Sequence, residues 1–157
     1  CPDRILSRAE SAVFVERGEH GAIADPPYAP PATPTFGDVP PSYWGYGWIE
    51  SLWADGFTAG CLLTPFSYCP ERQHTRAEGS VFFLRIEYGA AYTPPPGTGI
   101  FTDVLPGDWF YDWAEAAYNG GLLPACLTDP LAYCPNSPLD RAWAAYMMVR
   151  AKGIPVP

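Results

Sequence analysis

Residues 69–78 read Cys-Pro-Glu-Arg-Gln-His-Thr-Arg-Ala-Glu, and the same pattern, Cys-Pro followed after five residues by Arg-Ala, also begins at residues 1 and 134. The three copies align without a gap and place Arg8, Arg76 and Arg141 at one position of the pattern. A pattern that returns at a fixed spacing indicates an array of structural repeats. The motifs on either side of these copies therefore define the repeat.

Two complete repeats are expected, at residues 36–89 and 101–157, and residues 1–21 match only the second half of a repeat. Proline-rich linkers at 22–35 and 90–100 separate them. The partial repeat suggests that the chain is a piece of something longer or that a neighbouring molecule supplies the missing half. The aligned landmarks are Asp38 with Asp103, Trp44 with Trp109, Trp48 with Trp113, Gly56 with Gly121, and Cys61 with Cys126.

Each repeat predicts two helices separated by a loop. Apolar residues at three- and four-residue steps indicate a first helix over 44–54 and over 109–118, each stopped by glycine. Capping boxes at Ser7 and Thr75 start second helices over 8–17 and 76–88, and Asp140 caps a third one that runs to about Lys152 without the reciprocal glutamate. Residues 58–70 and 124–135 carry too many turn residues for a strand. The expected fold class is therefore all-α.

The five cysteines predict two local disulfides, because Cys61 and Cys69 have the same spacing as Cys126 and Cys134. Cys1 remains, as a thiol whose partner lies upstream or in another molecule. Such bonds persist in oxidising compartments, which predicts export to the cell surface or beyond. Reduced packing cysteines or zinc ligands are the alternatives, but no Cys-x-x-Cys pair is present and His20 and His74 sit at no ligand spacing. Lipidation of Cys1 is a further, weaker alternative.

The composition excludes several function classes. A net charge of -8 with one lysine, Lys152, argues against a nucleic-acid surface. No apolar run approaches the length of about 20 residues needed to cross a bilayer. We expect neither a metal site nor a cofactor. No catalytic set is recognisable, since the carboxylates mostly occupy cap and turn positions and no histidine has a nucleophile beside it, so a non-enzymatic protein is expected.

Several motifs in order resemble an S-layer homology repeat: Phe36-x-Asp38-Val-Pro, a Trp-rich first helix, Gly56-Phe-Thr58-x-Gly60 and Thr75-Arg-Ala-Glu78. The likeness covers nearly the whole chain except the linkers, and the paired cysteines look like a variant feature. The resemblance implies repeats of helix, loop and helix arranged around a pseudo-threefold helical bundle. It also implies a role at the bacterial cell surface.

The same resemblance implies candidate glycan-binding residues, which in this sequence are Arg76, Gly56, Thr58, Gly60 and Arg8. In the family such residues line grooves that hold acidic, often pyruvylated, wall sugars. The last repeat departs from this pattern, because Gly121-Leu-Leu-Pro-Ala125 replaces Gly-x-Thr-x-Gly and Asp140 stands beside Arg141. We expect no working glycan site there. The candidate tryptophans Trp44, Trp48, Trp109 and Trp113 are expected to fill a core rather than to stack on sugars.

Two functions of different class follow. The first is an extracellular structural protein whose copies join through the partial repeat into a surface layer, filament or tube, with Cys1 bonded to a neighbour. The second is a module that anchors an exported protein to acidic cell-wall polysaccharide. The partial repeat favours the first, because the missing half would leave an apolar slot for a partner.

Overall fold

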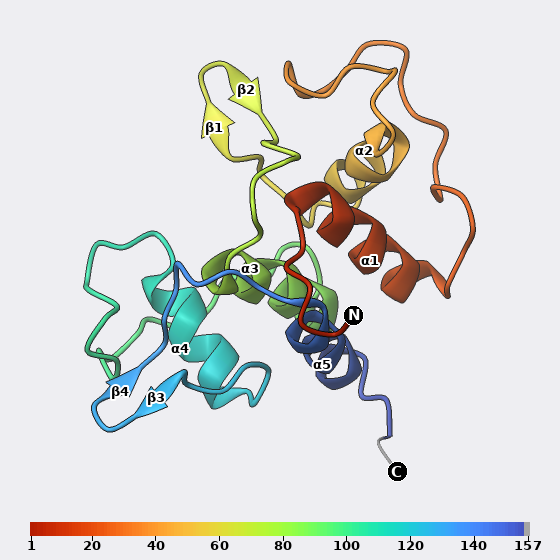
Figure 1. Ribbon diagram of the computed structural model, residues 1–157. Helices are drawn as coiled ribbons and strands as arrows, with labels where there is room; N and C mark the ends of the chain where they lie inside the picture. Colours follow the sequence, from red (N-terminus) through yellow and green to blue (C-terminus); the bar gives the residue numbers. More distant parts are fainter. Residues whose placement is uncertain (156–157) are drawn as a thin grey trace. The chain divides into compact units, whose positions relative to one another are not determined.

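The computed structural model describes residues 1–155, which form five helices and two small antiparallel sheets (Figure 1). The elements in chain order are α1 (Arg8–His20), α2 (Tyr46–Ala54), β1 (Leu62–Leu63), β2 (Phe66–Ser67), α3 (Arg76–Tyr88), α4 (Tyr111–Asn119), β3 (Leu127–Thr128), β4 (Leu131–Ala132) and α5 (Arg141–Ala151).

The prediction of an all-α fold, with helices around a pseudo-threefold bundle, is wrong in class, because the chain is mixed α/β. Each disulfide-closed loop, expected to be free of strands, contains a two-stranded hairpin. In the first hairpin Leu62 pairs with Ser67 and Leu63 with Phe66. The turn between the strands holds a cis Thr64–Pro65 bond, and Asp129–Pro130 is cis in the second hairpin. The turn residues, from which we expected no strand, thus form the turn of a hairpin. Its strands are too short to show an alternation of apolar and polar residues in the sequence.

The chain divides into two compact units, Leu6–His74 and Cys1–Ile5 with Thr75–Pro157. In the first unit α1 packs against α2, and the β1-β2 hairpin follows α2 (Figure 1). The helices approach through small side chains, because Ala9 and Ala12 on α1 are fully buried together with Ile49 and Leu52 of α2. Aromatic rings of Phe36, Phe66 and Tyr68 pack beside this helix pair.

In the other unit α3 contacts both α4 and α5. Its core contains Leu84, Phe101, Ala114, Leu139 and Met147. Both units therefore pair the second helix of one sequence repeat with the first helix and loop of the next. The compact units are staggered by half a repeat relative to the sequence repeats.

The predicted capping boxes are confirmed. The Ser7 side chain accepts a hydrogen bond from Glu10 N–H while Glu10 accepts one from Ser7 N–H, and Thr75 and Glu78 do the same for α3. Asp140 caps α5 by accepting from Trp143 N–H, without the reciprocal bond. Side-chain caps of this kind are worth about 1 kcal/mol each.

The start of each of these three helices rests on a Cys-Pro segment, and each contact lies within one unit. At each start, two backbone N–H groups of the helix donate to two carbonyl oxygens of a Cys-Pro segment. The bonds are Arg8 to Arg72 and Ala9 to Pro70, then Arg76 to Ser137 and Ala77 to Pro135, and finally Arg141 to Arg4 and Ala142 to Pro2. The sequence pattern that opens each copy therefore encodes one backbone junction. Within the described part of the chain, the helices are all too short or too polar to cross a membrane.

Candidate functional site

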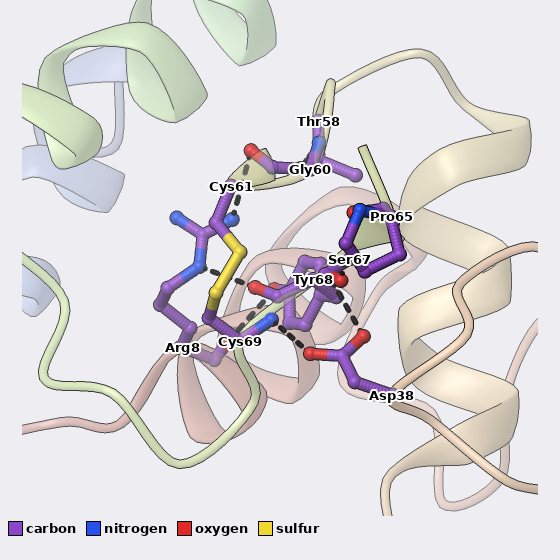
Figure 2. Close-up of a disulfide and its surroundings, with 9 residues drawn as sticks. All are labelled: Arg8, Asp38, Thr58, Gly60, Cys61, Pro65, Ser67, Tyr68 and Cys69. Atoms are coloured by element: carbon purple, nitrogen blue, oxygen red, sulfur yellow. Dashed lines mark hydrogen bonds between the residues drawn. A yellow bond between two sulfur atoms is a disulfide. The ribbon is translucent and has the colours of Figure 1, made fainter. Parts of the chain in front are cut away.

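An aspartate before the first helix of each repeat holds the disulfide-closed loop in place (Figure 2). The Asp38 carboxylate accepts hydrogen bonds from Tyr68 N–H at 2.8 Å and Cys69 N–H at 2.7 Å. Cys69 is bonded to Cys61, as the sequence predicted, with a Cα–Cα distance of 6.0 Å. The loop is thus fixed at one end by a covalent bond and two charge-assisted hydrogen bonds.

Arg8 enters this loop from α1. Its Nε–H donates to Tyr68 O at 2.8 Å and its Nη2 to Gly60 O at 3.4 Å. The guanidinium carbon lies 4.7 Å from the centre of the Tyr68 ring, and the Tyr68 hydroxyl donates back to Arg8 O at 2.9 Å. Arg8 is fully buried. The arginine of the repeat motif therefore links the second helix of one repeat to the loop of the next.

The second unit repeats this arrangement with Arg76. The Cys126–Cys134 disulfide closes the loop, and Asp103 accepts from Tyr133 N–H and Cys134 N–H. Arg76 donates through Nε to Tyr133 O at 2.8 Å and through Nη2 to Pro124 O. Burial lowers the pKa of Arg76 and raises the pKa of Tyr133 to about 12. In this unit the Tyr133 hydroxyl forms a short hydrogen bond with the hydroxyl of Ser80.

The structure brings some of the candidate glycan-binding residues together. Arg8 meets Gly60, and the hydroxyl of buried Thr58 accepts from Gly60 N–H at 3.2 Å. Gly56 closes α2 with a positive φ of 76°. Arg76 belongs to the other unit and meets Pro124 instead. Both guanidinium groups donate to protein carbonyls, so a sugar carboxylate would have to compete with these bonds, and the glycan role of the set stays a prediction.

The four candidate tryptophans divide into two pairs. Trp48 is buried and Trp113 is half-buried, each beside an arginine of the packed second helix, Arg17 and Arg85 respectively. Trp44 and Trp109, by contrast, are 59% and 61% exposed at equivalent positions of the two repeats. The expectation of a core role therefore does not hold for the exposed pair.

The acidic residues contribute more to the fold than the sequence indicates. The positions of Asp38 and Asp103 before a helix predict caps or turn formers, yet both carboxylates accept hydrogen bonds from the loop backbone. Buried Glu115 in α4 accepts hydrogen bonds from the N–H groups of Thr98, Gly99 and Ile100 and so holds the linker against the helix. Burial acts to raise the pKa of Glu115, but these donors outweigh it and the pKa is lowered. The sequence does place glutamates Glu50 and Glu115 at the same position of the two repeats. Glu50 has the same role, because it accepts a hydrogen bond from Thr35 N–H of its linker at 2.8 Å.

Each loop also groups an aspartate with two sulfur atoms, Asp38 with Cys61 and Cys69, and Asp103 with Cys126 and Cys134. Both sulfur pairs are oxidised, so they offer no thiolate to a metal. Cys1 is a free, exposed thiol. Its bonding to a neighbouring molecule stays a prediction.

No protein-family model matches this chain, and a search of curated proteins also finds no match.

Proposed function

We propose that this chain is part of an exported structural protein whose copies associate with one another outside the cell. The observation that carries the proposal is the exposure of leucines on both disulfide-closed hairpins. Leu62 is 54% exposed, Leu63 82% and Leu127 55%. Large apolar side chains on a rigid projection indicate a site of protein association, because the loop is ordered before it binds.

The hairpin occurs twice, and this favours assembly over simple pairing. Leu62 and Leu127 occupy the same position of the two loops. A subunit with two such surfaces can contact two neighbours, and a contact between unlike surfaces closes into a ring or continues as a filament. The assignment to a surface layer, filament or tube built of S-layer homology repeats rests on the motif order in the sequence.

Two further properties support an extracellular site of action. The disulfides fit an oxidising compartment, where such bonds persist. The net charge of -8 keeps subunits soluble before they assemble and gives no cationic surface for nucleic acid. The role we propose is structural rather than catalytic.

Sedimentation velocity at increasing protein concentration, with electron microscopy of the same samples, tests the proposal. Wild-type protein should form concentration-dependent oligomers. Leu62→Asp combined with Leu127→Asp should remain monomeric. Leu105→Asp is the matched control, because Leu105 is 62% exposed outside both hairpins and its replacement should leave assembly intact.

Electrophoresis without reductant, run in parallel, reports whether Cys1 joins copies covalently. Alkylation of Cys1 should abolish any such dimer and leave the hairpin-dependent oligomers unchanged. A wild-type protein that sediments as a monomer at every concentration would overturn the proposal.

One observation favours the second candidate, an anchor to acidic cell-wall polysaccharide. The exposed Trp44 and Trp109 offer flat apolar faces on which sugar rings stack, once in each unit. This reading expects retention of the wild type on purified wall polysaccharide and loss of retention in Trp44→Ala with Trp109→Ala. Leu105→Ala should be retained like the wild type.

A further inference from the structure

Three side chains that can bind metal meet where α1 and α2 end, inside the Leu6–His74 unit. Glu16 and His20 lie one turn apart on α1, and Asp55 follows α2 directly. The His20 Nε2 atom lies 2.7 Å from Asp55 Oδ2 and 3.5 Å from Glu16 Oε2. One ligand atom from each residue falls within 4.8 Å of the other two.

Glu16 is the unusual member of this cluster. Its side chain is fully buried, and neither carboxylate oxygen has a hydrogen-bond partner. A buried carboxyl group without a partner is costly, so buried charges in proteins are normally paired or bound to a metal. A cation bound by the cluster would therefore compensate the Glu16 carboxylate.

The other compact unit, which contains Thr75–Pro157, shows that the fold does not need these charges. At the positions of Glu16, His20 and Asp55 it has Leu84, Tyr88 and Gly120. Leu84 is buried, and a Cβ built on Gly120 would lie 3.9 Å from the Tyr88 hydroxyl, so the helix ends approach each other there too. Because the same helix junction forms there without a carboxylate or an imidazole, we infer that the ionisable set serves a purpose other than packing.

We propose that Glu16, His20 and Asp55 together bind a divalent transition-metal ion of the zinc class. One imidazole nitrogen and two carboxylate oxygens are ligands that zinc accepts, and three protein ligands leave one position for water. The metal would compensate the charge of the buried Glu16 carboxylate.

The two separations that involve His20 fit such an ion with a small adjustment, and Glu16 and Asp55 lie within 4.8 Å of each other. Two ligands at about 2.0–2.1 Å from zinc in a tetrahedron lie about 3.3 Å apart. The separation between His20 Nε2 and Glu16 Oε2 is 3.5 Å, and the 2.7 Å separation from Asp55 Oδ2 needs to widen by about 0.6 Å.

The aspartate already has a hydrogen-bond donor that would orient it. The Tyr28 hydroxyl donates to Asp55 Oδ1 at 2.6 Å, which leaves Oδ2 for the metal. The Tyr28 ring also meets the His20 imidazole edge to face, with centroids 5.7 Å apart. Partners of this kind orient metal ligands. The ion would join the ends of α1 and α2 to the proline-rich linker that carries Tyr28.

Spacing between histidines does not reveal this set, because only one of its three members is a histidine. The available signal was Glu16 and His20 at i and i+4, a spacing that puts two ligands on one helix face. Asp55 could be added only once α1 and α2 were known to pack together.

Isothermal titration calorimetry with Zn²⁺ tests the proposal on the full chain. Cys1 is alkylated first, because its exposed thiol would bind zinc by itself. Wild-type protein should bind one ion per chain and unfold at a higher temperature with Zn²⁺ than with EDTA. Ca²⁺ should bind far more weakly, since an imidazole is a poor ligand for it.

The variants take the residues found at the equivalent positions of the other unit: Glu16→Leu, His20→Tyr and Asp55→Gly. Each should lower zinc affinity by at least about 100-fold, whereas Tyr28→Phe should lower it roughly 10-fold. Glu19→Gln is the control for charge alone and should bind zinc nearly as the wild type does. Glu16→Leu should also be no less stable than the wild type in EDTA, which separates loss of the ligand from loss of the fold.

Two results would overturn the proposal. One is a wild-type protein that takes up no Zn²⁺ after Cys1 is blocked. The other is zinc binding of wild-type affinity in folded His20→Tyr or Asp55→Gly protein, which would place the ion elsewhere. Neither result bears on the hairpin-mediated assembly proposed above.

Discussion

Arg8 and Tyr68 exchange hydrogen bonds across the junction between one repeat and the next. The Arg8 Nε–H donates to Tyr68 O, and the Tyr68 hydroxyl donates to Arg8 O. The guanidinium also lies over the Tyr68 ring at 4.7 Å from its centre. A planar cation that donates in two directions and stacks on an aromatic face cannot be replaced by an ammonium group.

Arg8→Lys should therefore destabilise the Leu6–His74 unit. Lysine retains the positive charge but loses the fork that reaches both Tyr68 O and Gly60 O. We expect a loss of about 2–3 kcal/mol in the free energy of unfolding, because buried hydrogen bonds to a charged group are left unmade. Urea titration followed by tryptophan fluorescence measures it.

Tyr68→Phe serves as the comparison for this pair. It leaves Arg8 O without the hydroxyl donor but keeps the ring under the guanidinium, so its cost should be smaller, about 1 kcal/mol. An Arg8→Lys protein as stable as the wild type would show that Arg8 does not stabilise the contact between α1 and the loop. That result would favour the glycan-binding role instead.

Asp38→Asn should loosen the disulfide-closed loop. The variant keeps the size of the side chain, but only its single carbonyl oxygen can accept from Tyr68 N–H or Cys69 N–H. The expected cost is about 2 kcal/mol in unfolding free energy. Hydrogen exchange at the two amides should rise in the same variant. Asp25→Asn, an exposed aspartate in the linker, is the matched control and should change neither quantity.

Part of this fold could be predicted from the sequence. Helix starts at Ser7, Thr75 and Asp140 followed from capping chemistry, which acts within four residues. The hairpins could not be predicted, because two-residue strands have no alternation to detect.

The sequence identifies residues of the site but does not predict how they are arranged. The repeat pattern marked Arg8 and Arg76 as equivalent, yet it could not tell that each guanidinium lies inside the loop of the following repeat. That contact joins residues about sixty positions apart, and the burial of both arginines depends on it. The same limit explains why Asp38 was expected to be a helix cap or a turn former rather than an acceptor for the loop backbone.

Gly60→Ala should be costly for two separate reasons. Gly60 has φ +80°, where an L side chain is strained, and a Cβ there would lie 2.7 Å from Ser67 O. Strain of this kind costs about 1–2 kcal/mol, and the clash with backbone adds to it. We expect a total of about 3 kcal/mol by chemical denaturation.

Gly21→Ala separates the two contributions. Gly21 has φ +85° but nothing within 4 Å of the added Cβ, so only the strain should remain. Equal losses in the two variants would show that the loop moves to accept the methyl group. The repeat at 101–157 has Ala125 at the position of Gly60. There the arginine, Arg76, donates to Pro124 O rather than to the carbonyl of the residue that replaces the glycine.

Glu115 should make the second unit sensitive to acid. Its pKa is lowered from the ordinary value of 4.5, because the backbone donors of Thr98, Gly99 and Ile100 favour the charged form more than burial disfavours it. A carboxyl group with a depressed pKa stabilises the folded state above its unfolded pKa and loses this contribution as the pH falls through the folded value. Unfolding free energy should therefore decrease below about pH 4.5.

Glu115→Gln isolates this contribution. At pH 7 the variant should be less stable than the wild type by about 2–3 kcal/mol, because the amide has one acceptor oxygen for donors that now bind two. The difference should shrink as the pH falls, because protonation of Glu115 in the wild type removes the same charge. Glu50→Gln should show a smaller difference, since Glu50 accepts from the linker at Thr35 N–H. A Glu115→Gln protein whose deficit stayed constant from pH 7 to pH 3 would mean that the linker is held by shape rather than by the carboxylate charge.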